Sequence, residues 1–167
     1  MTSDWRSTFR TIPTRLRASL PADLQSFEWS ATSWMAKAWY GNRALHYEIW
    51  LRSSAKVVEV GLHFEADALT NARLLAAFRS RAREIKRGLG PGARIEEWDK
   101  GWTRVWEAFP VATPDVRENV ASRFCDYIRV LEPILRDEVP SDIEWVLAKP
   151  RPRRNARRAA TSSQTSR

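Results

Sequence analysis

Apolar and polar residues alternate with a period of two in two neighbouring segments, residues 46–52 and 57–65. This alternation is typical of β-strands that bury one face and turn the other outward. The short connection at residues 53–56 predicts that the two strands form an antiparallel hairpin. Its core-facing side chains would be Tyr47, Ile49, Leu51, Val58, Val60, Leu62 and Phe64.

The apolar period changes to that of an α-helix after this hairpin. We predict a single helix over residues 69–89, ended by the glycine- and proline-rich residues 88–92. The apolar residues on its buried side follow one another at spacings of three and four, and they are Leu75, Phe78, Ala82, Ile85 and Leu89.

A second hairpin and a second long helix follow. Residues 93–99 and 102–109 flank a turn at residues 99–101, with glycine where a left-handed backbone is needed. An apolar stripe then predicts a helix over residues 116–135. The hairpin would place Trp98 beside Trp102, Glu96 beside Arg104 and Arg94 beside Trp106.

The order β-β-α-β-β-α predicts an α+β fold. A four-stranded antiparallel sheet with two long helices on one face would bury both sets of apolar side chains in a two-layer sandwich. We divide the chain into an N-terminal segment that packs on the core (1–44), an α+β core domain (45–148) and a disordered basic tail (149–167). The N-terminal segment is expected to contain a short broken helix up to residue 20 and one extended aromatic stretch over residues 27–40.

The net charge of +8 points to an anionic partner, but the charge is unevenly distributed. Residues 149–167 hold seven basic residues and no acidic one, whereas residues 1–148 hold 21 basic and 20 acidic residues. The tail, with Arg151, Arg153 and Arg154, would attract nucleic acid or an anionic membrane without reading a base sequence. A terminus that merely increases solubility is the alternative.

The predicted helix over residues 69–89 is the strongly basic element of the body, with six basic residues against Glu84 alone. Such a helix could lie on a phosphate backbone. The alternative is a solvated face whose charge is balanced by acidic residues of the second helix. The candidate nucleic-acid-binding residues here are Arg73, Arg79, Arg83, Lys86 and Arg87.

Both histidines of the protein lie in a His-x-Glu pattern on the first predicted hairpin. Because strand residues two apart share a face, His46, Glu48, His63 and Glu65 would all lie opposite the core, with His46 across from His63. Imidazole and carboxylate groups at this range can bind zinc, manganese or iron. The alternative is a set of ordinary polar residues on a half-exposed sheet. Apart from such a divalent metal, no cofactor is expected.

Nine tryptophans are an unusually large number for 167 residues. Trp50, Trp98, Trp102 and Trp106 would share the face opposite the core and offer an aromatic surface to bases, a ligand or another protein. An exposed strip of four tryptophans would be a large apolar patch. We therefore expect the N-terminal aromatic segment to cover this face and to form a second small core.

The sequence argues against several classes of protein and site. The single cysteine, Cys125, excludes an intramolecular disulfide, and its apolar neighbours indicate a core position. No apolar stretch is long enough to span a bilayer and no signal peptide is recognisable, so we expect a cytoplasmic protein. Phosphate-binding glycine loops and the HExxH motif of zinc proteases are absent from the sequence.

The HYEIW and EVGLHFE strands, the helix that ends in LG, the EEWDKGW hairpin and the final long helix occupy residues 46–139. In this layout and these short phrases the chain resembles an uncharacterised bacterial β-β-α-β-β-α domain family. Domains of similar layout are sometimes found with restriction-endonuclease-like partners. The resemblance implies a fold and a genomic neighbourhood, and it assigns no catalytic residue.

Three functions remain as alternatives at this point. The first, which we favour, is a non-enzymatic module that associates with nucleic acid or a nucleic-acid-processing complex through the 69–89 helix and the tail. The second is a metal-dependent enzyme or small-ligand binder that uses the His/Glu cluster on the sheet face. The third is a protein-interaction or oligomerisation domain that uses exposed tryptophans.

Overall fold

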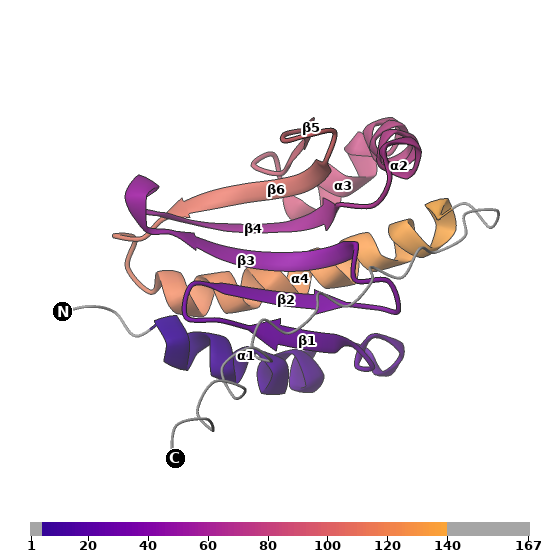
Figure 1. Ribbon diagram of the computed structural model, residues 1–167. Coiled ribbons are helices and arrows are strands. Elements are labelled where there is room, and N and C mark those ends of the chain that lie inside the picture. The colour runs from indigo at the N-terminus through magenta and orange to yellow at the C-terminus, as the bar shows by residue number, and fades with distance from the viewer. Residues whose placement is uncertain (1–4, 140–167) are drawn as a thin grey trace, which may run out of the picture.

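Six antiparallel strands form one sheet in the computed structural model, which describes residues 5–139 (Figure 1). The order across the sheet is β1-β2-β3-β4-β6-β5, so β4 pairs with β6 rather than with the next strand in sequence. The strands are β1 (Glu28–Ala31), β2 (Met35–Trp39), β3 (Leu45–Arg52), β4 (Val57–Phe64), β5 (Arg94–Glu97) and β6 (Thr103–Pro110).

The first predicted hairpin is confirmed together with its register. β3 and β4 pair antiparallel, with Tyr47 opposite Leu62 and Ile49 opposite Val60. Of the side chains predicted to face the core, Leu51 is half-buried and the others are fully buried. Alternation of apolar and polar residues therefore located the two central strands correctly.

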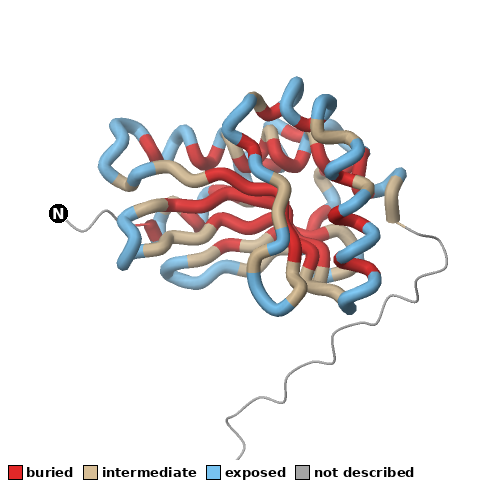
Figure 2. Tube along the Cα trace, turned by 90° about the horizontal axis from the view of Figure 1, so that it is seen from above, coloured by how far each residue is buried: buried red, intermediate tan, exposed pale blue. Residues whose placement is uncertain are grey.

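The α-helices of residues 5–139 lie together on one face of the sheet, behind the strands in Figure 1. The longest, α4, packs against β3 and β4, and the ring of Phe124 contacts Trp29 and Tyr47 edge-on at 6.1 and 6.5 Å between centroids. Figure 2 shows the buried positions continuing along the central strands. The helices are α1 (Trp5–Ser19), α2 (Ala68–Ser80), α3 (Ala82–Leu89) and α4 (Val116–Glu138).

The expectation of four strands is wrong, because residues 28–39 add two more strands at the edge of the sheet. The stretch predicted as one extended segment turns back at residues 32–34, where the Thr32 hydroxyl accepts hydrogen bonds from the backbone N–H groups of Trp34 and Met35. The core side of β2 consists of two alanines, Ala36 and Ala38, both fully buried. Alanine gives a weak strand signal, so the pattern did not reveal this hairpin.

The single helix predicted over residues 69–89 is also wrong, since the helix breaks at Arg81 into α2 and α3. The apolar spacing continues across the break, with Phe78 and Ile85 both fully buried, so periodicity alone could not detect it. Arg81 forms ion pairs with Glu84 on its own side of the break and with Asp137 and Glu138 of α4. These contacts hold the Arg81 side chain at the point where α2 ends and α3 begins.

The second predicted hairpin is confirmed. β5 and β6 pair with Arg94 opposite Trp106 and Glu96 opposite Arg104, as expected. The turn uses a left-handed backbone at Lys100 (φ 52°) and at Gly101 (φ 78°). A glycine at the second of these positions avoids the steric cost that a Cβ atom would carry there.

The N-terminal segment does not cover the face of the sheet opposite the helices, so that expectation is wrong. α1 packs beside α4 on the helix side, where Trp5, Phe9 and Ile12 join the main core. Trp29 on β1 likewise points to the helix side and contacts Phe124. The aromatic residues of this segment therefore enlarge one core instead of building a second.

The predicted basic tail over residues 149–167 lies outside the described residues, as do residues 140–148. Within residues 5–139 no helix is both long and apolar enough to cross a membrane.

Candidate functional site

The face of the sheet opposite the helices, called the outer face below, carries an unusual number of buried polar side chains. The helices of the described chain lie on the other side of the sheet, so none of them covers this face (Figure 1). Its polar side chains are nevertheless at most 5% exposed at five positions, His46, Glu48, Glu59, His63 and Arg104. Polar groups at this depth need partners, since an unpaired one is costly.

Aromatic rings from the β5–β6 hairpin provide part of the cover. The ring of Trp98, just after β5, stands edge-on to His63 at 5.6 Å and lies 6.4 Å from Trp50. The Arg104 guanidinium lies over the rings of Trp98 and Trp106, at 4.7 and 3.7 Å from their centroids. The hairpin register that places Trp98 and Arg104 together is the one predicted from the turn.

The two histidines face each other across β3 and β4. His46 is directly opposite His63 in the register, and their rings stack nearly parallel, 5.6 Å apart with 10° between planes. The sequence placed both residues on one face and opposite one another, and the structure agrees with that placement.

A hydrogen bond to the backbone orients the ring of His46. Its Nδ1 lies 2.9 Å from the backbone carbonyl oxygen of Arg43, and a carbonyl can only accept a hydrogen bond. Nδ1 therefore carries a proton. Nε2 lies 2.8 Å from Lys37 Nζ and 3.3 Å from Glu48 Oε2.

Glu48 is held as a carboxylate by its neighbours. Burial by itself would raise the pKa of Glu48, but the hydrogen bond with His46 and nearby positive charge, including the Lys37 ammonium, lower this pKa to about 2. Lys37 Nζ lies 2.8 Å from Glu48 Oε2. Glu48 thus has a cation of its own, the Lys37 ammonium.

His63 has a different environment from His46. Its Nδ1 is buried and has no hydrogen-bond partner among the described residues, and the nearest carboxylate oxygen, Glu65 Oε1, is 3.8 Å away. Burial lowers the pKa of His63 to about 3, so the ring is neutral near pH 7. A neutral imidazole keeps a lone pair that can bind a metal ion.

Three of the four residues predicted as metal ligands come together. One ligand atom from each of His46, His63 and Glu65 can be chosen so that all three lie within 4.8 Å of one another. Glu65 Oε1 is 3.9 Å from His46 Nε2, and the Glu65 side chain is the most exposed of the three at 21%. The fourth predicted residue, Glu48, stays with Lys37 instead.

Sequence reasoning missed Lys37 and Arg104 as members of this cluster. Lys37 lies on β2, directly opposite Glu48, and β2 was not recognised as a strand. Arg104 was expected beside Glu96, and it does bind Glu96 Oε1, but it also reaches Glu59 Oε2 across the sheet at 3.0 Å. That second contact requires β4 and β6 to be neighbours, which the order of elements did not predict.

The predicted aromatic surface is only partly a surface. Trp50, Trp98 and Trp102 are half-buried and follow one another with ring centroids 6.4 and 6.0 Å apart, whereas Trp106 is buried. Gly61 lies opposite Trp106, and a Cβ atom there would come within 2.8 Å of the Trp106 Cβ. The tryptophans thus mainly cover the polar cluster and leave little ring area free.

The predicted basic residues of α2 and α3 are exposed on the outside of the helix layer. Arg73, Arg79, Arg83, Lys86 and Arg87 are all exposed, whereas Arg81 is half-buried among its ion pairs. Within residues 5–139, Arg79, Arg83 and Lys86 form no ion pair. Two acidic residues of α4, Asp137 and Glu138, are engaged by Arg81. Arg151, Arg153 and Arg154 lie outside the described residues.

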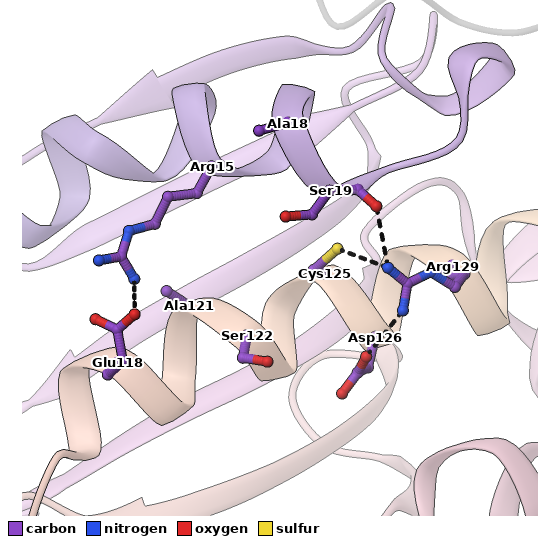
Figure 3. Close-up of a pocket in the computed structure, with 9 residues that line it drawn as sticks. All are labelled: Arg15, Ala18, Ser19, Glu118, Ala121, Ser122, Cys125, Asp126 and Arg129. Carbon is purple, nitrogen blue, oxygen red and sulfur yellow. Dashed lines mark hydrogen bonds and ion pairs between the residues drawn. The ribbon is translucent and has the colours of Figure 1, made fainter.

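A groove of about 430 Å³ runs between α1 and α4 (Figure 3). Its charged groups neutralise one another, since Arg15 binds Glu118 and Arg129 binds Asp126. Burial raises the pKa of the Cys125 thiol in its wall, which weakens that thiol as a nucleophile. Cys125 is buried as predicted, and the groove holds no set of convergent unpaired groups.

A smaller pocket of about 260 Å³ lies at the other end of α4. Tyr40, Leu45, Glu132 and Arg136 are among the residues that line it. Burial raises the pKa of Glu132, and hydrogen bonds from Tyr47 and Arg136 oppose this change. The donors already occupy both oxygens of the carboxylate, so Glu132 is built into the core rather than presented to a ligand.

Comparison with protein-family models, with curated proteins and with solved structures finds no match to this chain. The resemblance to an uncharacterised bacterial domain family stays a prediction.

Proposed function

We propose that this chain is a non-enzymatic binding module that associates with nucleic acid through the exposed basic side of α2 and α3. The observation that carries the proposal is the group of cations at Arg79, Arg83 and Lys86, which form no ion pair within residues 5–139. Most other arginines of the body are paired or lie over aromatic rings. Unpaired cations on one helical surface supply the sequence-independent part of nucleic-acid affinity.

These cations lie on both sides of the break at Arg81, with Arg79 at the end of α2 and Arg83 and Lys86 on α3. The buried residues Phe78 and Ile85 hold the other side of each helix against the core, so the exposed cations point away from it. Contacts of this kind go to phosphates, so they position the protein without selecting a base sequence.

The basic tail adds to this surface on grounds of sequence alone. Its seven basic residues and lack of acidic ones would raise the affinity for any polyanion and increase the dependence on salt. An association with a nucleic-acid-processing complex would use the same surface, because such a complex presents the nucleic acid itself.

A protein-interaction or oligomerisation role has less support. Among the described residues, two large apolar side chains are exposed, Trp34 at 47% and Leu69 at 61%, and they lie on different elements. A stable protein interface usually needs a contiguous apolar centre.

The test is fluorescence anisotropy with a labelled 20-base-pair DNA duplex and a single-stranded RNA of matching length, between about 50 and 200 mM salt. The triple variant Arg79→Gln, Arg83→Gln, Lys86→Gln is compared with Arg6→Gln, Arg10→Gln, Arg117→Gln. The control residues are also exposed cations without ion pairs in residues 5–139. Both variants therefore lose the same net charge.

The first variant is expected to bind more weakly than the control by about tenfold or more, with a smaller slope of log affinity against log salt. Equal binding by the two variants would overturn the proposal. Absence of binding by the unmodified protein at 50 mM salt would do the same. If deletion of residues 149–167 removes all binding while the first variant behaves as the control does, the tail is the binding element and α2–α3 is not.

A further inference from the structure

The outer face contains a buried imidazole nitrogen without a partner, His63 Nδ1, next to a carboxylate and a second imidazole. We propose that His46 Nε2, His63 Nδ1 and a carboxylate oxygen of Glu65 bind one divalent transition-metal ion. Two imidazoles and one carboxylate are a ligand set typical of zinc and of ferrous iron. This site lies on the other face of the sheet from α2 and α3. A test of metal binding is therefore independent of a test of nucleic-acid binding.

The two distances from Glu65 are close to those that a metal ion requires, and all three ligand atoms lie within 4.8 Å of one another. Glu65 Oε1 lies 3.8 Å from His63 Nδ1 and 3.9 Å from His46 Nε2. Two ligands of a tetrahedral zinc ion, each about 2.1 Å from the metal, lie about 3.4 Å apart. A movement of about half an ångström by the partly exposed Glu65 side chain would bring the carboxylate to this separation from both nitrogens.

The imidazole of His46 is already oriented as a ligand. Its Nδ1–H donates to the carbonyl oxygen of Arg43, which leaves Nε2 as the nitrogen available to a metal, 3.9 Å from Glu65 Oε1. Metal-binding histidines commonly use their second nitrogen in this way, because the hydrogen bond fixes both the tautomer and the ring direction. The two rings are now nearly parallel, with 10° between their planes, so one ring must turn for both lone pairs to meet at one ion.

The missing hydrogen bond of His63 gives the second, independent indication. The His63 ring is 2% exposed, and Trp98 packs edge-on against it, so bulk water does not surround Nδ1. A buried polar atom without a partner is unfavourable and uncommon in folded proteins. A metal ion on Nδ1 would use the lone pair that the protein itself leaves unpaired.

Charged groups around the site decide whether a dication is acceptable there. Glu48 and Glu65 contribute two negative charges, and the nearest cation is Lys37, whose Nζ lies 2.8 Å from both His46 Nε2 and Glu48 Oε2. Arg104 is paired with Glu59 and Glu96. Lys37 must therefore leave His46 when a metal binds. Its side chain is 19% exposed, so its ammonium can move toward solvent while staying near Glu48.

Lys37 consequently competes with the metal for His46 Nε2. Chance binding of a metal elsewhere on the protein would not depend on Lys37. Removing the ammonium frees the His46 lone pair and makes the site more negative. Three protein ligands would leave one position on the ion for water or a small molecule, as in metal sites that bind substrates.

The experiment is isothermal titration calorimetry of full-length protein, purified without a histidine tag and freed of metal with a chelator. Zinc chloride and manganese chloride are the titrants, and the visible absorption of the cobalt(II) form reports ligand geometry. The expected result is one zinc ion per chain. Glu65→Gln and His63→Gln are expected to weaken zinc binding by at least about tenfold. Lys37→Met is expected to strengthen it several-fold.

Glu28→Gln is the matched control, because Glu28 is an exposed carboxylate on the same face, at the edge strand β1. It is expected to bind zinc as the unmodified protein does. Should His63→Gln fail to fold, Glu65→Gln and Lys37→Met carry the test, since both replace partly exposed side chains. No binding of zinc, manganese or cobalt by the unmodified protein overturns the proposal. Unchanged zinc binding by Glu65→Gln, or weaker binding by Lys37→Met, also overturns it.

Discussion

The two faces of the sheet bury their side chains by different means. On the helix side, Tyr47, Ile49, Val60 and Leu62 are covered by α4 and its neighbours, as in an ordinary two-layer core. On the outer face, polar side chains of the same strands, such as His46 and His63, are just as inaccessible to solvent. They are covered by other side chains of the sheet, such as Trp98, and not by a helix.

The difference lies in what each kind of burial requires. Apolar side chains are stabilised by removal from water and by close packing, and neither requires a specific polar partner. Each polar side chain also needs a hydrogen-bond or charge partner. Three buried nitrogens of the outer region, on His63, Trp98 and Trp106, have no such partner among the described residues. These atoms are where a ligand or ordered water would be expected.

The largest effect is expected from a change on the helix side. Phe124 is fully buried between α4 and the sheet, in contact with Trp29 and Tyr47. Phe124→Ala should reduce the free energy of unfolding by about 3–5 kcal/mol, measured by denaturant-induced unfolding. A loss below about 1 kcal/mol would show that the helix layer is not the main source of stability.

A change at the centre of the outer face should come next. A Cβ atom at Gly61 would lie 2.7 Å from the Val105 carbonyl oxygen and 2.8 Å from the Trp106 Cβ. Gly61→Ala is therefore expected to destabilise the protein by about 1–3 kcal/mol in the same unfolding measurement. Gly92→Ala is the control, because its Cβ would meet only a carboxylate oxygen of Glu107, at 3.1 Å. Equal losses in both variants would contradict the tight packing at Gly61.

Removal of the aromatic cover should have a smaller effect. Trp98→Ala deletes ring contacts with His63, Trp50 and Trp102, and contacts of this kind contribute about 0.5–1.5 kcal/mol each. We expect a total loss of about 1–2 kcal/mol, since the ring is already half-exposed. The exposed Trp34 provides the control, and Trp34→Ala should change stability by less than about 0.5 kcal/mol. A neutral Trp98→Ala would mean that Trp98 does not protect the cluster.

The smallest expected effect concerns Glu132, a buried carboxyl group on the helix side. Burial is the main influence on Glu132 and raises its pKa in the folded protein. The resulting stabilisation is present below the ordinary pKa of a glutamate and is lost as pH rises through the raised value. Relative to the unmodified protein, Glu132→Gln should therefore gain stability as the pH rises from about 4 to about 7. The measurement is the free energy of unfolding of both proteins at each pH. A relative loss would mean that Tyr47 and Arg136 stabilise the charged form more than burial opposes it.

Periodicity predicted the elements in which apolar residues are large and regularly spaced. The alternating positions of residues such as Val58 and Leu62 predicted the central strands, and the turn at Gly101 predicted the β5–β6 hairpin. β2 was missed because its buried positions are alanines, and the break at Arg81 was missed because helical spacing continues through it. Both features depend on tertiary contacts that local patterns do not contain.

The candidate site could be predicted only as far as it is local to one hairpin. The pairing of His46 with His63 follows from alternation and a short turn. The contributions of Lys37 and Arg104 come from strands that join the sheet on either side, and the pattern did not specify those neighbours. The sequence placed Trp98 on this face, but its contact with His63 depends on the pairing of β4 with β6, which the order of elements did not specify.

The two outermost strands of the sheet, β1 and β5, are four residues long, whereas β3, β4 and β6 have eight. A strand at the border of a sheet offers unpaired backbone groups to any other chain that can extend it. Short borders that carry charged residues, such as Glu28 on β1 and Arg94 on β5, offer few such groups. The protein can therefore keep a broad sheet and a tryptophan-rich sequence while resisting aggregation through its edges.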